Sequence, residues 1–230
     1  MRLPRILLTR RLSTLSAVTL LAVAAILSTG GARAGEVKIA VAANFTQAAK
    51  DIAALFERET GHKAVLSFGS TGEIYTQIAK GAPFEVFLAA DRARPRKAGA
   101  DGLGIEQTRF TYATGKIVLY SRNADLIEGP STLKKDGFSK IAIANPVTAP
   151  YGAAAIQAME KLGVYAALKE KIVQGNNIAQ THQFVQSGNA EVGFVALSQL
   201  APHKDGSRWP VPQNLYTPIA QDAILLTAGK

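Results

Sequence analysis

Short apolar runs alternate with longer stretches of helical period from Val37 almost to the end of the chain. The first run, Val37–Ala43, consists of β-branched and small apolar residues around one lysine and predicts a buried strand. In the next stretch apolar residues recur at spacings of three and four up to Gly61, which is typical of an amphipathic helix. Because strand and helix alternate at this spacing, the sequence predicts mostly parallel sheets with helices on both faces.

The alternation continues along the chain and divides into two groups of elements. Further strands are predicted at 63–68, 85–90, 116–120, 140–145, 171–175, 191–200 and 221–226, the sixth of them running toward a final helical turn, and further helices at 73–81, 151–163 and 177–188. The polar, glycine-dotted stretch 99–115 is predicted to cross between the groups. We therefore expect an α/β protein of two lobes with a cleft between them. The expected boundaries are 35–115 for the first part of lobe I, 116–216 for lobe II and 217–230 for a strand that returns to lobe I.

The first 34 residues have the features of a secretory signal peptide. Four arginines precede the apolar run Leu15–Leu27, and "ARA" follows just before Gly35. The run is too short to span a bilayer comfortably, and no later stretch of about 18 apolar residues supplies another span. The sequence therefore predicts export to the periplasm and no membrane insertion after the leader is removed.

Charge and cysteine content narrow the possible partners. Removal of the leader lowers the formal net charge from +9 to +4, because the leader holds five arginines and no acidic residue. The small positive net charge is only weak evidence for an anionic partner. The remaining basic residues are scattered rather than clustered, which argues against nucleic acid. The chain has no cysteine, so neither a disulfide framework nor a lipid-anchored N-terminus is expected.

Polar residues follow four of the predicted strands at the point where the next helix begins. They are Asn44, Ser70 with Thr71, the segment 145–151, and Asn176 with Asn177. In open parallel sheets ligands bind beyond the carboxyl ends of the strands, where helix N–H groups point outward. Capping alone is the alternative interpretation of each junction, and Ser70 with Glu73 spells a capping box. Because two junctions lie in each expected lobe, we expect them to converge on the cleft.

These junctions offer amide, hydroxyl and N–H donors but no lysine or arginine. A neutral site rich in donors suits a fully deprotonated oxyanion, which only accepts hydrogen bonds. Phosphate carries a proton near neutrality and needs an acceptor in its site, whereas sulfate, molybdate and tungstate do not.

Catalytic chemistry is poorly supported. The three histidines, His62, His182 and His203, lie apart without zinc-binding spacing. The "GSTG" segment is not a nucleophile elbow, and no histidine is placed to activate Ser70. We therefore expect no catalytic or metal-binding residues and no enzyme. A hydrolase with Ser70 as nucleophile and a sensor domain remain as alternatives from other classes.

Four segments make the sequence resemble the periplasmic molybdate-binding proteins of ABC importers, which have the type II periplasmic binding-protein fold. They are "VAANFTQAAKDIAALFERETG", "SFGSTGEIYTQIAKGAPFEVFLAAD", "IAIANPVTAPYGAAAIQAM" and "GNNIAQTHQFVQSGNAEVGFV". The resemblance implies a monomeric carrier without a cofactor, which binds molybdate and also tungstate and delivers the anion to a membrane permease. A carrier of another tetrahedral oxyanion such as sulfate is the alternative within the fold, and cavity size would separate the two.

The resemblance also implies four ligand-binding residues. Asn44 and Ser70 fall at the ligand positions of the first lobe, where the serine gives its hydroxyl and its N–H group. Tyr151 falls where some members have a tyrosine, and Ile178 where the family offers a main-chain N–H group. Other members take a tyrosine from the strand end that here reads "GFVALS". This chain has Ala196 at that place, so Tyr151 would supply the hydroxyl.

Two further expectations follow from the resemblance. The lobes should close about hinges near Ala113–Lys116 and Leu215–Ile219. The family continues past the strand that matches "QDAILL" into a helical segment of roughly 25 residues on lobe I. Because this sequence ends at Lys230, we expect a C-terminal truncation that affects the stability of lobe I more than the ligand chemistry.

Overall fold

The computed structural model describes residues 34–201 and 205–229. The predicted signal peptide, residues 1–34, lies outside this part of the chain apart from Ala34, and so does His203. Within the described residues no helix combines the length and the hydropathy that are needed to cross a membrane. Residues from Glu36 onward form one compact unit that contains two sheets.

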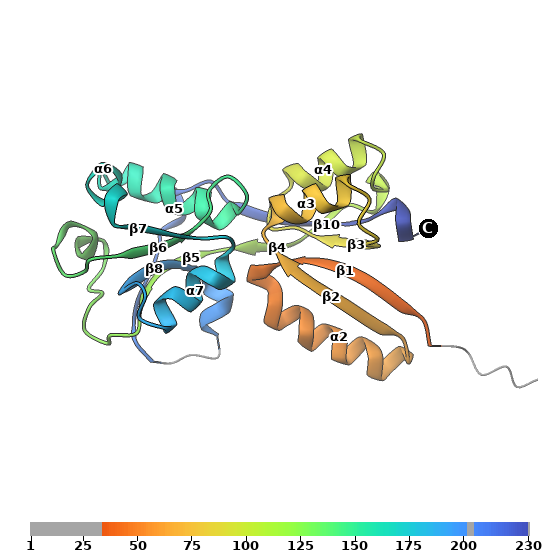
Figure 1. Ribbon diagram of the computed structural model, residues 1–230, viewed down its shortest axis with the longest axis horizontal. Helices are drawn as coiled ribbons and strands as arrows, with labels where there is room; N and C mark the ends of the chain where they lie inside the picture. The colour runs from red at the N-terminus through yellow and green to blue at the C-terminus, as the bar shows by residue number, and fades with distance from the viewer. Residues whose placement is uncertain (1–33, 202–204, 230) are drawn as a thin grey trace, which may run out of the picture. The chain divides into compact units, whose positions relative to one another are not determined.

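The first sheet has the strand order β2-β1-β3-β10-β4 (Figure 1). Its strands are β1 Glu36–Ala42, β2 Lys63–Gly69, β3 Val86–Leu88, β4 Phe110–Gly115 and β10 Ile219–Leu225. Its helices are α2 Thr46–Thr60, α3 Thr71–Ala79 and α4 Ala93–Ala100. Helix α2 covers one face of the sheet, and α3 and α4 cover the other. We call this sheet with its three helices lobe I.

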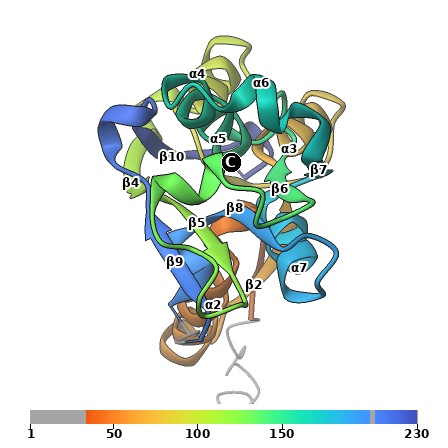
Figure 2. The same ribbon diagram turned by 90° about the vertical axis from the view of Figure 1, so that its left-hand side faces the viewer.

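The second sheet has the strand order β7-β6-β8-β5-β9. Its strands are β5 Ile117–Ser121, β6 Ile141–Ala144, β7 Ile172–Gly175, β8 Val192–Ala196 and β9 Ser207–Pro210. Its helices are α5 Pro150–Lys161, α6 Tyr165–Leu168 and α7 Ile178–Gln186. Figure 2 views this sheet from its far end, with α5 and α7 on opposite sides of it. We call the second sheet with its helices lobe II.

The expectation of mostly parallel sheets is confirmed, with one reversed strand in each. Strand β1 pairs in parallel with β2 and β3, and β6 pairs in parallel with β7 and β8. Strand β10 runs antiparallel to both of its neighbours, as does β5. The chain crosses from β4 to β5 through Lys116 and from β9 to β10 through 211–218. Each reversed strand therefore comes directly after a crossing that contains no α-helix of the kind that connects parallel strands.

One fold expectation was wrong. The stretch 99–115 was predicted to cross between the lobes, but it ends in strand β4, which pairs with β10 inside lobe I. Strand β4 lies at the edge of the sheet, and Phe110 at its start is 60% exposed. Its polar, exposed residues lack the clear alternation of a half-buried strand, so the pattern did not reveal it.

The two lobes are packed to different degrees. In lobe II Leu119, Met159 and Phe194 are fully buried in one large core. In lobe I a smaller core, which includes Ile74 and Phe87, lies between the sheet and α3. On the other face of that sheet, α2 leaves a cavity of about 400 Å³ lined only by apolar residues. The face of lobe I under α2 is therefore incompletely filled.

Candidate functional site

All four residues predicted to bind the ligand line one cavity between the lobes. Asn44 and Ser70 come from lobe I, and Tyr151 and Ile178 come from lobe II. None of the four is more than 5% exposed. The cavity has a volume of about 10 Å³, which is about enough to hold one water molecule. The lobes are thus closed tightly over these residues.

Three helices begin at this cavity. Thr71 opens α3, Pro150 and Tyr151 open α5, and Ile178 opens α7. N–H groups in the first turn of a helix have no acceptor within that helix, and the helix dipole places partial positive charge there. No lysine, arginine or acidic residue is among the described residues that line the cavity. The positive electrostatic potential in the cavity therefore comes from backbone groups rather than from charged side chains.

Ser70 caps α3 and still keeps a donor for the cavity. Its Oγ atom accepts the N–H of Glu73 at 3.4 Å, which confirms Ser70 as the N-cap. The other bond of the predicted capping box, from the Ser70 N–H to the Glu73 carboxylate, is not among the hydrogen bonds of the described residues. The hydroxyl of the neighbouring Thr71 accepts the N–H of Ala90 at 3.0 Å. Because both oxygens act as acceptors here, both hydroxyl protons remain available to a ligand. Glu73 does not line the cavity, so its charge does not oppose an anion directly.

Asn44 is not a helix cap, which corrects one interpretation of the sequence. It lies in the 3-10 turn Ala43–Phe45, and α2 begins after Phe45 without a side-chain cap. The Nδ2 group of Asn44 instead donates to Oε1 of Gln221 at 2.7 Å. Its Oδ1 atom is buried without a partner in the described structure. The extra 3-10 turn moves Asn44 away from the start of α2 and leaves it at the cavity.

Gln221 is the site residue that the sequence analysis missed. It is 3% exposed on β10, and its Oε1 atom also accepts from the hydroxyl of Tyr112 at 3.3 Å. Its Nε2 group donates to the hydroxyl of Tyr151 at 3.5 Å. The ladder between β10 and β4 is irregular between Gln221 and Asp222, as in β-bulges that redirect side chains toward a site. The available signal was the polar pair Gln221 and Asp222 within the apolar strand Ile219–Leu225.

Tyr151 is arranged as a donor. Because its oxygen accepts from Gln221, its proton can be donated to another group. Burial raises the pKa of the Tyr151 hydroxyl above its ordinary value, so the proton stays in place at neutral pH. Gly115 makes this position possible, since a Cβ atom there would lie 2.2 Å from the tyrosine hydroxyl oxygen.

At Asn177 the cap interpretation is confirmed. Its Oδ1 atom accepts the N–H groups of Ala179 at 2.9 Å and Gln180 at 3.1 Å. The N–H of Ile178, which precedes both, is not used by this cap. Asn145 organises the turn before α5 by accepting the N–H of Val147 at 2.9 Å. Ala196 ends β8 and does not line the cavity, so Tyr151 is the tyrosine that does.

The arrangement can bind a small group that only accepts hydrogen bonds. Hydroxyl protons and helix N–H groups of both lobes surround the cavity, so one ligand can contact both lobes. Among the described residues, no three His, Cys, Asp or Glu side chains are grouped so that they could hold a metal ion.

Comparison with known proteins gives consistent matches. Residues 37–230 match the bacterial extracellular solute-binding protein family. The chain is 56% identical over 205 residues to the molybdate-binding protein ModA of Azotobacter vinelandii, covering 86% of this chain and 81% of the relative. It is 52% identical over 198 residues to ModA of Rhodobacter capsulatus, covering 86% and 79%. The solved periplasmic molybdate-binding protein of A. vinelandii matches with a TM-score of 0.80 at 41% identity, covering 83% of this chain and 85% of that chain.

Proposed function

This chain belongs to the bacterial extracellular solute-binding protein family, and we propose that it binds molybdate in the periplasm and delivers it to the permease of an ABC importer. The two ModA relatives, which are 56% and 52% identical over 86% of this chain, and the solved protein at 41% identity are molybdate-binding proteins. Tungstate, a tetrahedral dianion of the same kind, is expected to bind as well. The protein acts as a monomeric carrier and not as an enzyme.

The observation that supports this function is the set of neutral donors at one buried cavity. Ser70 and Tyr151 offer hydroxyl protons, and helices α3, α5 and α7 point their N-termini at the same place. Hydrogen bonds to a charged acceptor stabilise a complex by roughly 1.5 to 3 kcal/mol each. A tetrahedral dianion can accept from all of these groups at once.

Ligand binding is coupled to closure of the lobes. The cavity takes Asn44 and Ser70 from lobe I and Tyr151 and Ile178 from lobe II, so a bound anion stabilises the closed arrangement over an open one. The proposed hinges, Ala113–Lys116 and Leu215–Ile219, overlap the two crossings of the chain.

Native mass spectrometry of the exported protein tests the proposal. Molybdate, tungstate, sulfate and phosphate are added in turn and then in pairs. We expect one molybdate or tungstate per chain, and no displacement by an equal concentration of sulfate or phosphate. Equal competition by sulfate would assign the protein to general oxyanion transport, and retention of none of the four anions would refute the function.

A further inference from the structure

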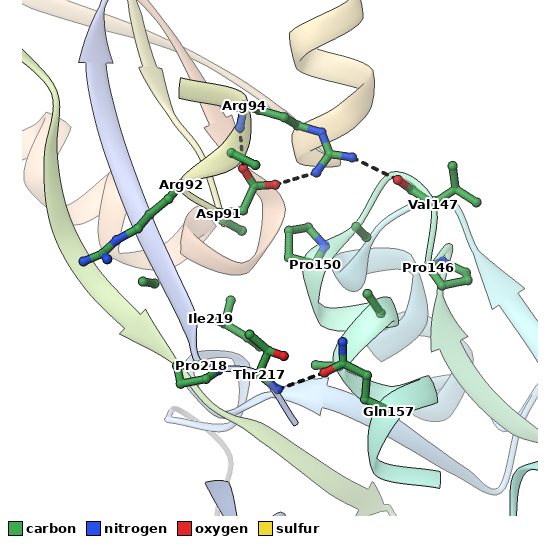
Figure 3. Close-up of a pocket in the computed structure, with 16 residues that line it drawn as sticks. Asp91, Arg92, Arg94, Pro146, Val147, Pro150, Gln157, Thr217, Pro218 and Ile219 are labelled. Atoms are coloured by element: carbon green, nitrogen blue, oxygen red, sulfur yellow. Dashed lines mark hydrogen bonds and ion pairs between the residues drawn. The ribbon is translucent and has the colours of Figure 1, made fainter. Parts of the chain in front are cut away.

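A second cavity, of about 340 Å³, lies beside the ligand cavity and separates the lobes along one flank (Figure 3). Residues of both lobes line it, and it shares Ala90, Ala149 and Pro150 with the ligand cavity. Because side chains do not fill this space, the lobes gain little from apolar packing on this flank. Hydrogen bonds at the rim of the cavity therefore matter for holding the lobes together here.

Two such hydrogen bonds face each other across the cavity (Figure 3). The Nη2 group of Arg94 donates to the carbonyl oxygen of Val147 at 2.9 Å. On the opposite side, the N–H of Thr217 donates to Oε1 of Gln157 at 2.8 Å. Thr217 belongs to the crossing 211–218, so that bond lies next to a hinge and changes little when the lobes move. The Arg94 bond joins elements away from the crossings and must break when the lobes open.

Arg94 is held in place from its own lobe. Its N–H donates to Oδ1 of Asp91 at 2.9 Å, and its guanidinium pairs with Oδ2 of the same carboxylate. The two side chains are only 26% and 19% exposed. Because Asp91 fixes the rotamer, Arg94 loses little conformational entropy when it reaches the other lobe. Its bond to a neutral carbonyl is also charge-assisted.

The acceptor loop in lobe II is held by hydrogen bonds of its own, although the Val147 side chain is 78% exposed. Asn145 accepts the N–H of Val147 through Oδ1 and the N–H of Ala149 through its carbonyl oxygen. The next carbonyl after Val147, that of Thr148, accepts the N–H of Gly72 in α3 at 2.8 Å. Two successive carbonyls of this loop are thus bound by donors of lobe I. The loop leads directly into α5, which carries Tyr151.

Glycine at position 72 permits this close approach, because a larger residue would push its neighbours away. A Cβ atom there would lie 3.0 Å from Nη2 of Arg94 and 3.0 Å from Cα of Thr148. The α3 backbone can therefore approach the loop closely enough for both bonds to form.

We propose that Arg94 and Gly72 form a clasp on the carbonyl groups of Val147 and Thr148, which keeps the lobes closed and slows release of the bound oxyanion. Neither residue lines the ligand cavity, so both are positioning residues that act through the loop before Tyr151. The identity of the released anion rests on the proposed function, whereas the contact that keeps the lobes closed does not.

Dissociation rates give the first test. Arg94→Met removes the donors and keeps the aliphatic stem, and Arg96→Met removes the same charge from an exposed position of the same helix. In stopped-flow chase experiments with molybdate, Arg94→Met should release the anion about tenfold faster than the wild type, as expected for one lost charge-assisted bond. Arg96→Met should match the wild type, and Arg94→Lys should lie between the two. Equal rates for Arg94→Met and Arg96→Met would overturn the clasp.

Gly72→Ala tests the clasp from its other half. The added methyl group should hold the loop and α3 apart, so release should again be faster while the thermal unfolding midpoint of the anion-free protein changes little. Faster release in both Gly72→Ala and Arg94→Met cannot be explained by the loss of the pair with Asp91, because Gly72→Ala keeps that pair. A release rate in Gly72→Ala equal to that of the wild type would contradict the proposal.

A closure measurement without any anion separates this proposal from the proposed function. The chain has no cysteine, so Glu57→Cys in α2 and Gln183→Cys in α7 allow unique spin labels on the two lobes. We expect a short-distance population in the labelled parent protein and in its Arg96→Met variant, and its loss in Arg94→Met. Identical distance distributions would refute the clasp. If the wild type bound no molybdate, the proposed function would fail while this comparison still decided the clasp.

Discussion

The side-chain amide of Asn44 donates a 2.7 Å hydrogen bond to Gln221, which lies 177 residues further along the chain. Strand β10 returns the chain from lobe II and places Gln221 within hydrogen-bond distance of Asn44, in the turn that follows β1. Gln221 also donates to the hydroxyl of Tyr151. One buried amide therefore orients a proposed ligand residue of each lobe, and its orientation decides which atoms of Asn44 and Tyr151 face the cavity.

The charge of residue 221 should therefore control anion binding. Gln221→Glu keeps the shape and the acceptor for Asn44, but it removes the donor to Tyr151 and adds a carboxylate close to the anion. We expect it to weaken molybdate binding at least about tenfold more than Gln221→Met does, because like charges at short range repel strongly in a buried site. Titration calorimetry at pH 8 compares the two variants. Equal affinities would mean that Gln221 acts through packing alone.

Removal of the donor hydroxyls should weaken binding without unfolding the protein. Ser70→Ala and Tyr151→Phe should each reduce molybdate affinity by roughly 1 to 3 kcal/mol, since each removes a charge-assisted hydrogen bond. Ser131→Ala and Tyr165→Phe, which change the same residue types outside the cavity, are the matched controls. Calorimetric titrations that give unchanged affinity for both cavity variants would refute the site assignment.

Binding should not depend on pH between 7 and 9. Burial raises the pKa values of Tyr151 and Tyr112, so both hydroxyls stay neutral donors throughout this range. A raised tyrosine pKa stabilises the folded state fully below the unfolded value near 10, and that contribution is lost as the pH rises through the folded pKa. As the pH rises above 10, the free energy of unfolding measured in urea should therefore fall more for the wild type than for Tyr151→Phe. A fall in affinity between pH 7 and 9 that Tyr151→Phe abolishes would contradict this.

The apolar cavity under α2 should accept a larger side chain. Ala53 is half-buried and lines this cavity of about 400 Å³, whereas Ala54 on the same helix is exposed. Ala53→Leu should therefore raise the free energy of unfolding by about 1 to 2 kcal/mol, as apolar groups leave water without crowding the core. Urea denaturation of Ala53→Leu and Ala54→Leu measures the difference. Equal stabilities would show that the cavity does not admit the added side chain.

Much of the fold and of the candidate site could be predicted from local sequence patterns. Alternating strands and helices predict parallel sheets, and the rule that ligands bind beyond strand ends selects the junctions at Asn44, at Ser70 with Thr71, at 145–151 and at Asn176 with Asn177. The family resemblance then implies Tyr151 and Ile178 as ligand residues at the last two junctions. The structure places all four junctions around one cavity because helix N-termini and strand ends are short-range features that the sequence marks directly. The Ser70 cap belongs to the same class, since its partner Glu73 is three residues away.

By itself, then, the sequence determined the α/β alternation, the mostly parallel sheets and the polar junctions, because these depend on residues a few positions apart. Only the tertiary structure decided what those residues contact. It released Asn44 from capping α2 and paired it with Gln221, it put β4 at the edge of lobe I, and it set Arg94 against the Val147 carbonyl. These partners lie far apart in the chain, so no local periodicity in the sequence indicates them.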